Sequence, residues 1–189
     1  MAKIKLGPQS LLYPMPALLV GAQVNGKPNF ITVAWGGIAC GDPPMVSVAI
    51  RHTRHTLKGI MENKCFSVNV PGAGLVKEVD YCGIVSGAKA DKASVCNFKV
   101  VTGKLCGAPL IEACPVNLEC ELHHTIDLGS HVLVIGRITE THISEECLTN
   151  GRPDVTKINP LIYTTAQSQY QTLGAVVGKA FSVGNELKG

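Results

Sequence analysis

The chain of 189 residues is long enough to bury a substantial core, and we expect residues 1–189 to form a single domain. A net charge of only +3, with scattered basic residues and only 4 Phe and 4 Tyr, argues against a nucleic-acid-binding protein. The hydrophobic fraction of 46% against 16% charged residues predicts a rather apolar surface, as in a subunit that is partly covered by another.

The first two strands are predicted to form a hairpin. Residues 16–24 and residues 30–35 carry strand-like apolar patterns, and the Asn25-Gly26 pair between them is the strongest short hairpin signal. A Gly- and Pro-rich corner follows. The Val- and Ile-rich residues 45–50 then predict another strand.

Helical and strand signals alternate in the next segment. Thr53 can cap a short helix that runs to about residue 63, and residues 65–70 predict a strand that ends at a Pro-Gly pair. Residues 74–81 show helical spacing. Residues 82–94 are polar and indicate a loop with a short helix.

Strand patterns return in the second half of the chain, at residues 98–101, 116–126 and 131–143. Residues 149–160 predict an irregular connection, and the tail from residue 170 onward predicts no regular structure because it is interrupted by glycines. About seven strands with two or three short helices predict a mainly β fold, an antiparallel barrel or sandwich. Neither a G-x-G-x-x-G fingerprint nor a P-loop occurs, so a nucleotide ligand would be held in another way.

Eight cysteines occur, at positions 40, 65, 82, 96, 106, 114, 120 and 147, and none forms a C-x-x-C pair. The apolar run at residues 11–20 is broken by Pro14 and Pro16, so we expect no signal peptide. No run approaches the roughly 18 apolar residues that a membrane-spanning helix needs, so we expect no membrane association. The sequence therefore predicts free thiols in a reducing cytoplasm.

A zinc site made of Cys120, His123 and His124 is an alternative use of one cysteine. Adjacent residues of a strand point to opposite faces, so these three side chains cannot converge easily. We therefore expect no metal site.

The segment after residue 50 gathers cationic and hydroxyl side chains. Its members are Arg51, His52, Thr53, Arg54, His55 and Thr56. A phosphate monoester needs positive charge and several converging donors, and a helix N-terminus adds free N–H groups and partial positive charge. The segment is thus either a phosphate site or a basic solvated turn with a Thr cap.

Small or polar residues precede this segment, and they would let a planar ring approach the backbone closely. They include Asn29, Thr32 and Ala34. Trp35 is the only tryptophan, and it either covers such a ring or anchors the core.

Motifs along nearly the whole chain carry a family resemblance. They are TVAWGGIACGDPPMVSVAIR, HTRHT, FSVNVP, SGAKADK (86–92), NGRPDVTKINP (150–160) and GKAFSVG (178–184). Together they resemble the flavin reductase-like, FMN-binding split-barrel family, and within it most of all the flavoredoxin branch. The resemblance implies a mainly β, antiparallel, Greek-key-like split β-barrel with a few short helices, forming a homodimer that binds FMN noncovalently near the subunit interface.

The resemblance also implies positions for the cofactor. The ring would lie along Asn29, Thr32, Ala34 and Trp35. The phosphate would lie among Arg51, Thr53, Arg54, His55 and Thr56. The turn at residues 80–83 and the segment 86–92 would lie near the ring or the ribityl chain, and the candidates there are Asp80, Cys82, Gly83, Ser86 and Lys92. Lys92 would stabilise the reduced ring, which is anionic, or else it is an exposed loop lysine.

One motif departs from the family. Many NAD(P)H-using relatives show Gly-Asp-His before the last long strand, whereas this chain has Gly129-Ser130-His131. His131 is kept and is a candidate for assistance at the flavin, or it is a plain turn residue. Cys40 and Cys82 are either redox-active beside a flavin or inert buried thiols. No side chain is expected to act as a nucleophile.

The sequence thus predicts an FMN-binding electron carrier of flavoredoxin type. It would work between a donor such as NAD(P)H or reduced ferredoxin and an acceptor protein or small molecule, so that the chemistry belongs to the flavin. The alternatives are an NAD(P)H-dependent FMN reductase, a noncatalytic FMN-binding or storage protein, and a structural dimer without a cofactor.

Overall fold

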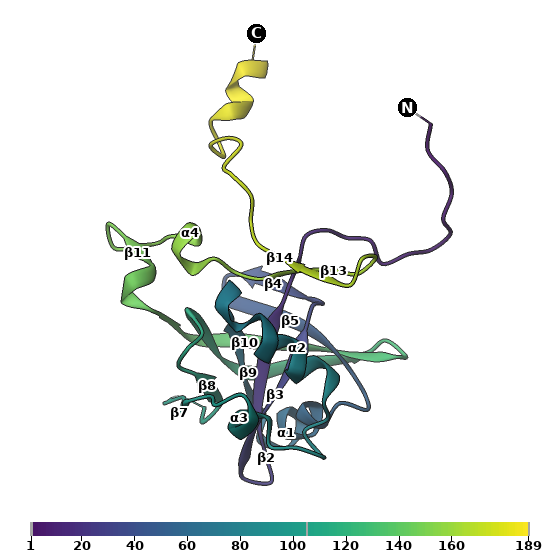
Figure 1. Cartoon of the computed structure of the whole chain (residues 1–189), viewed down its shortest axis with the longest axis vertical. Helices are drawn as coiled ribbons and strands as arrows, with labels where there is room; N and C mark the ends of the chain where they lie inside the picture. Colours follow the sequence, from purple (N-terminus) through teal and green to yellow (C-terminus); the bar gives the residue numbers. More distant parts are fainter. Residues whose placement is uncertain (1, 105, 189) are drawn as a thin grey trace.

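The computed structural model describes residues 2–104 and 106–188. Its centre is a seven-stranded antiparallel sheet in the order β3-β2-β6-β9-β10-β5-β4. These strands are β2 (Leu18–Val24), β3 (Lys27–Val33), β4 (Gly36–Gly41), β5 (Pro44–Arg51), β6 (Cys65–Val70), β9 (Val116–Asp127) and β10 (His131–Ile143). β3 at one edge also contacts β5 near the other edge, so the sheet curls toward a barrel (Figure 1). The expected mainly β, antiparallel fold is confirmed.

Short elements cover the barrel. The remaining strands are β1 (Met15–Pro16), β7 (Val100–Thr102), β8 (Pro109–Ile111), β11 (Leu148–Thr149), β12 (Arg152–Pro153), β13 (Ile162–Thr164) and β14 (Gln169–Gln171). The helices are α1 (His55–Asn63), η1 (Ala73–Leu75), α2 (Val76–Ile84), α3 (Lys92–Val95), η2 (Glu145–Cys147), α4 (Val155–Ile158) and η3 (Val183–Leu187).

The hairpin between β2 and β3 forms as its turn residues predict. Asn25 and Gly26 have φ of 51° and 73°, the left-handed region that a two-residue hairpin turn requires. The register pairs Val24 with Lys27 across the turn. This hairpin brings β3, which carries several of the candidate ring residues, next to the rest of the sheet.

Two hydrophobic clusters stabilise the barrel. The first fills its interior, where Phe66 and Val48 are fully buried, and α1 closes one end with Leu57 and Ile60. The second lies outside the sheet, where Phe30 of β3 packs under α2, α3 and the segment around β8. The second cluster therefore fixes α2 against β3.

Three local expectations were wrong. The Gly- and Pro-rich corner contains the edge strand β4, which is held by pairing with β5 although its own residues have little strand pattern. Arg54, not Thr53, is the N-cap residue of α1, and no side chain caps that helix. The expected turn at residues 80–83 is the last part of α2, because Val79 and Cys82 are buried against the second cluster.

The second half of the chain is more regular than expected. Strands β9 and β10 match their predicted ranges closely. The strand expected at residues 98–101 begins at Val100 and pairs with β8, which lacks a strand-like pattern. The tail contains β14, paired with β13 in a hairpin that joins β1.

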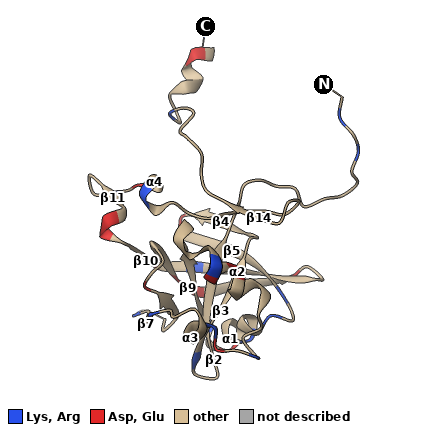
Figure 2. Cartoon of the chain, in the orientation of Figure 1, with Lys and Arg blue, Asp and Glu red and all other residues tan. Residues whose placement is uncertain are grey.

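Both termini leave the barrel as extended arms on the same side (Figure 1). The arm that follows β14 is exposed throughout its described part, and it carries the fully exposed side chains of Val177 and Phe181. Acidic and basic residues are dispersed over the fold without a stripe of one sign (Figure 2).

All eight cysteines are free thiols, as the sequence predicts. Cys120 is buried, whereas His123 and His124 are exposed. Across residues 2–104 and 106–188, no cluster of side chains could hold a metal ion. In that part of the chain, no helix is long and apolar enough to span a membrane.

Candidate flavin site

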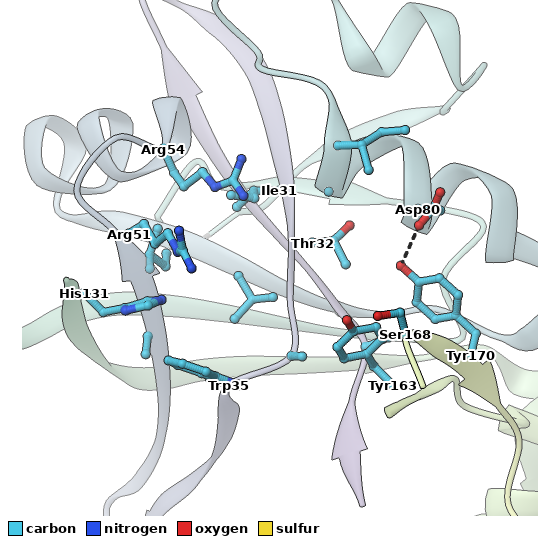
Figure 3. A pocket seen from close by; sticks show the side chains of 17 residues that line it. Ile31, Thr32, Trp35, Arg51, Arg54, Asp80, His131, Tyr163, Ser168 and Tyr170 are labelled. Carbon is cyan, nitrogen blue, oxygen red and sulfur yellow. Dashed lines mark hydrogen bonds between the residues drawn. The ribbon is translucent and has the colours of Figure 1, made fainter. Parts of the chain in front are cut away.

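A cavity of about 380 Å³ opens beside β3, within the roughly 300–1,000 Å³ typical of small-molecule sites. It is lined by β3 and the residues that follow it, the end of β5, the start of α1, α2, the start of β10, the β13–β14 hairpin and Ala17 (Figure 3). Its lining residues are Ala17, Ile31, Thr32, Val33, Ala34, Trp35, Ala49, Ile50, Arg51, Arg54, Asp80, Gly83, Ile84, His131, Tyr163, Ser168 and Tyr170.

One end of the cavity is cationic. Arg51 ends β5, Arg54 is the N-cap residue of α1, and His131 begins β10 opposite Arg51 in the sheet register. Figure 3 shows both guanidinium groups and the imidazole at the same end. Neither Arg51 nor Arg54 has a carboxylate partner among the described residues, so their charge is available to an anionic ligand.

Trp35 and His131 form one wall of this end. Their ring centroids lie 4.6 Å apart with an interplanar angle of 35°. The Oγ of Ser130 lies 2.8 Å from Nδ1 of His131 and fixes the ring orientation. Burial lowers the pKa of His131, and the positive charges of Arg51 and His52 add to that effect. The imidazole is therefore neutral near pH 7.

The middle of the cavity is lined by small groups. Thr32 donates a hydrogen bond from Oγ1 to the carbonyl of Val79, which ties β3 to α2. A Cβ on Gly83 would lie 3.4 Å from Cβ of Thr32, at ordinary van der Waals distance, so α2 lies directly against this strand. Ala34 adds only a methyl group. A flat ring fits such a slot better than a bulky ligand does.

The opposite wall was not predicted from sequence. It is built from Tyr163, Ser168 and Tyr170 of the β13–β14 hairpin, and Asp80 of α2 faces them (Figure 3). Tyr170 donates a hydrogen bond from its hydroxyl to Oδ1 of Asp80 over 3.1 Å. The sequence feature that could have indicated this wall is the pair of tyrosines near the tail. No local pattern links Tyr170 to Asp80, which lies 90 positions earlier.

A second cavity of about 490 Å³ holds three more of the sequence-predicted residues, namely Asn29, His55 and Lys92. Lys92 is only 3% exposed. It donates hydrogen bonds of 2.9 Å and 3.1 Å to the carbonyls of Cys82 and Val85 at the end of α2. Burial lowers the pKa of Lys92, and the charge of Arg54 contributes. Lys92 is thus buried near Arg54 and is not an exposed loop lysine.

Four predicted residues line neither cavity. Thr56 is 1% exposed, and its Oγ1 accepts a hydrogen bond of 2.6 Å from Asn29. Cys82 is fully buried, and burial raises its pKa to about 12. Thr53 lies in the turn before α1, and Ser86 accepts a hydrogen bond of 3.3 Å from the backbone of Ala88. Thr56 and Ser86 therefore shape the surrounding backbone and side chains.

The fold and this site define a family. The sequence model of the family described as "Flavin reductase like domain" matches residues 10–174. The protein therefore belongs to that family. Its expected family and split-barrel fold are thereby confirmed.

Individual solved structures and proteins are similar to this chain in fold and sequence. The structure of flavoredoxin from Methanosarcina acetivorans has a TM-score of 0.94 and 39% sequence identity, covering 99% of this chain and 100% of that one. The flavoredoxin of Desulfovibrio vulgaris has a TM-score of 0.92 and 34% identity, covering 97% of this chain and 100% of that one. An uncharacterized protein from Archaeoglobus fulgidus is 34% identical over 145 residues, 76% of this chain and 80% of its own length. These similarities support flavin binding.

Proposed function

We propose that the protein is an FMN-binding flavoprotein of flavoredoxin type, which carries electrons between a reduced donor and an acceptor protein or small molecule. The observation that carries the proposal is the cationic end of the main cavity. Arg51 and Arg54 lie there without carboxylate partners among the described residues, beside a slot lined by small residues. A ligand with a flat ring and an anionic end matches both features.

The residues present fit FMN. Its phosphate would be held by Arg51 and Arg54 beside the N-terminus of α1, where free N–H groups and partial positive charge favour an anion. Thr32, Ala34 and Trp35 would lie along the ring. A bound flavin supplies one- and two-electron transfer, so the chain needs no nucleophile of its own.

The chain's own residues would set the surroundings of the ring. Trp35 and the β13–β14 tyrosines would cover a bound ring from two sides of the cavity. His131 is held neutral, so it can donate or accept one hydrogen bond without adding charge. Asn29, His55 and Lys92 in the neighbouring cavity would contact the polar part of the cofactor.

We further propose a homodimer located in the cytoplasm. The arm after β14 supports the dimer, because its exposed apolar side chains would be covered by a second subunit. The eight free cysteines are consistent with a reducing compartment.

Two measurements test the proposal. The purified protein should be yellow, or its apoprotein should take up FMN with a defined stoichiometry; a protein that binds no flavin at all would refute it. The holoprotein is then mixed anaerobically with NADH, NADPH or reduced ferredoxin. Bleaching by ferredoxin alone supports an electron carrier, and direct bleaching by NADH or NADPH supports the alternative, a flavin reductase. If no donor bleaches the flavin, electron transfer is wrong and a storage role replaces it.

A further inference from the structure

A cluster of three thiols lies outside both cavities, where β6, β9 and the β7–β8 loop meet. Cys65 begins β6, Cys120 lies in β9, and Cys106 lies in the loop between β7 and β8. Cys65 and Cys120 are 6% and 0% exposed, whereas Cys106 is half-buried. None of them lines the candidate flavin site.

Cys65 and Cys106 are in direct contact. The thiol of Cys65 donates a hydrogen bond to the backbone carbonyl of Cys106, and the thiol of Cys106 donates one of 3.7 Å to the carbonyl of Cys120. The loop that holds Cys106 is tightly folded, because the Gly103 N–H bonds the Ala108 carbonyl over 2.8 Å and Gly107 has a φ of 72°. The two cysteines are thus held in contact, and Cys106 is the more exposed of the two.

We propose that Cys65 and Cys106 are a redox-active dithiol site, in which Cys106 reacts with low-molecular-weight disulfides and Cys65 then closes an intramolecular disulfide.

The two thiols differ in pKa, as an attacking thiol and a resolving thiol should. The interaction with the Cys65 side chain lowers the pKa of Cys106 to about 7, against the opposing effects of burial and of Glu119. The same contact with Cys106 raises the pKa of Cys65, and burial adds to it. The attacking group is the thiolate, so Cys106 is the first to react and Cys65 is the resolving thiol.

The steps balance in atoms and electrons. The Cys106 thiolate attacks one sulfur of a disulfide RSSR, forming a mixed disulfide and releasing RS⁻. Cys65 loses its proton to RS⁻ or to water and attacks the Cys106 sulfur, which forms the Cys65–Cys106 bond and releases the second RS⁻. The protein loses two electrons and two protons, and RSSR is reduced to two RSH.

A second thiol pair provides a matched control. The side chains of Cys82 and Cys96 also interact, and Cys96 is half-buried like Cys106. Burial raises the pKa of Cys96, and burial raises the pKa of Cys82 to about 12. Both pairs thus consist of neighbouring thiols, but of these two half-buried cysteines Cys106 has a lowered pKa and Cys96 a raised one.

The rate of alkylation measures this difference without any variant. At pH 7 a thiol of pKa about 7 is half ionised, roughly 50-fold more than one of pKa about 9, and lower nucleophilicity cancels about 6- to 10-fold of that. Cys106 should thus react with iodoacetamide about five- to eightfold faster than an ordinary thiol, and faster still than Cys96. Peptide mass spectrometry of the full-length protein gives both rates. Equal rates at Cys106 and Cys96 would overturn the assignment.

The disulfide step is tested with excess oxidised glutathione at pH 7, followed by N-ethylmaleimide. The expected product lacks two alkylated thiols and contains a cross-link between the peptides of Cys65 and Cys106. Cys65→Ala should stop at a mixed disulfide on Cys106, Cys106→Ser should leave Cys65 alkylated, and Cys96→Ser should behave like the parent protein. A cross-link to Cys120, or a mixed disulfide that persists in the parent protein, contradicts the proposal.

Discussion

The hydroxyl of Tyr170 donates a hydrogen bond to Oδ1 of Asp80 over 3.1 Å, and this contact joins the β13–β14 hairpin to α2 across the mouth of the candidate site. Burial raises the pKa of Tyr170, and the bond to Asp80 adds to that effect, so the phenol stays protonated as a donor. This bond adds to the pairing of β13 with β1 in holding the wall of the cavity in place.

Tyr170→Phe should loosen this wall. We expect weaker flavin binding by about 1 kcal/mol, roughly fivefold, because the lost hydrogen bond is partly exposed. Titration of the apoprotein with FMN, followed by flavin fluorescence, measures the change. The control is Tyr163→Phe, which removes a hydroxyl from the same hairpin that has no hydrogen-bond partner among the described residues. Equal losses in both variants would contradict a specific role for the bond.

Arg51→Ala and Arg54→Ala should weaken FMN binding more than riboflavin binding. Each guanidinium would make charge-assisted bonds to the phosphate worth about 1.5–3 kcal/mol, roughly a 10- to 100-fold loss per residue. Calorimetric titrations of each variant with both ligands measure the ratio. Arg137→Ala is the control, because Arg137 pairs with Glu121 at 2.5 Å and lines neither described cavity. Equal weakening of both ligands would refute the phosphate assignment.

The stacked pair of Trp35 and His131 should make tryptophan fluorescence a reporter of pH. Protonated imidazole quenches a neighbouring indole, so the emission of the apoprotein should fall as pH decreases, with a midpoint below 6.5 because the pKa of His131 is lowered. His131→Asn should abolish the transition. Arg51→Ala removes one of the repelling charges and should raise the midpoint. A midpoint that Arg51→Ala leaves unchanged would contradict this electrostatic account.

Local patterns were sufficient for those parts of the fold that local physics determines. The Asn25-Gly26 turn was predictable because its positive φ values favour those two residue types. The cationic end was also predictable, since Arg51 and Arg54 are close in sequence at the junction of β5 and α1.

The parts that sequence reasoning missed depend on long-range pairing. β4 is a strand because β5 supplies its hydrogen bonds, whereas its glycines have little strand preference. Tyr170 reaches the cavity only because β13 pairs with β1 and places the hairpin beside α2. Lys92 is buried because its ammonium group reaches the last carbonyls of α2, a contact that its polar sequence context does not show.

The arm after β14 should determine the oligomeric state. Val177 and Phe181 are fully exposed in the single chain, so their burial by a second subunit would stabilise a dimer. Removal of residues 172–189 should convert a dimer to a monomer in light scattering coupled to size exclusion. The double substitution Val177→Ser with Phe181→Ser tests the side chains alone and should weaken the dimer. A truncated protein that remains fully dimeric would show that the interface lies elsewhere.

Asp154 should stabilise the segment from η2 to α4 in a pH-dependent way. Its carboxylate accepts hydrogen bonds from Thr149 at 2.7 Å and from Oγ1 and N–H of Thr156 at 2.5 Å and 3.0 Å. The hydrogen bond from the Thr156 side chain, together with those from Thr149 and the Thr156 backbone, lowers the pKa of Asp154 from 3.8 to about 2. Because the folded pKa is below the unfolded one, this stabilisation is complete above about pH 5 and is lost as pH falls through about 2.

The measurement is the melting temperature of Asp154→Ala against the parent protein between pH 7 and pH 3. We expect a lower melting temperature for the variant, by a constant amount from pH 7 to about pH 5 and by a shrinking amount below it. Asp42→Ala is the control, since the Asp42 carboxylate accepts no hydrogen bond from the described residues. If the difference between Asp154→Ala and the parent protein stays the same down to pH 3, the bonds to Thr149 and Thr156 do not depend on the charge of this carboxylate.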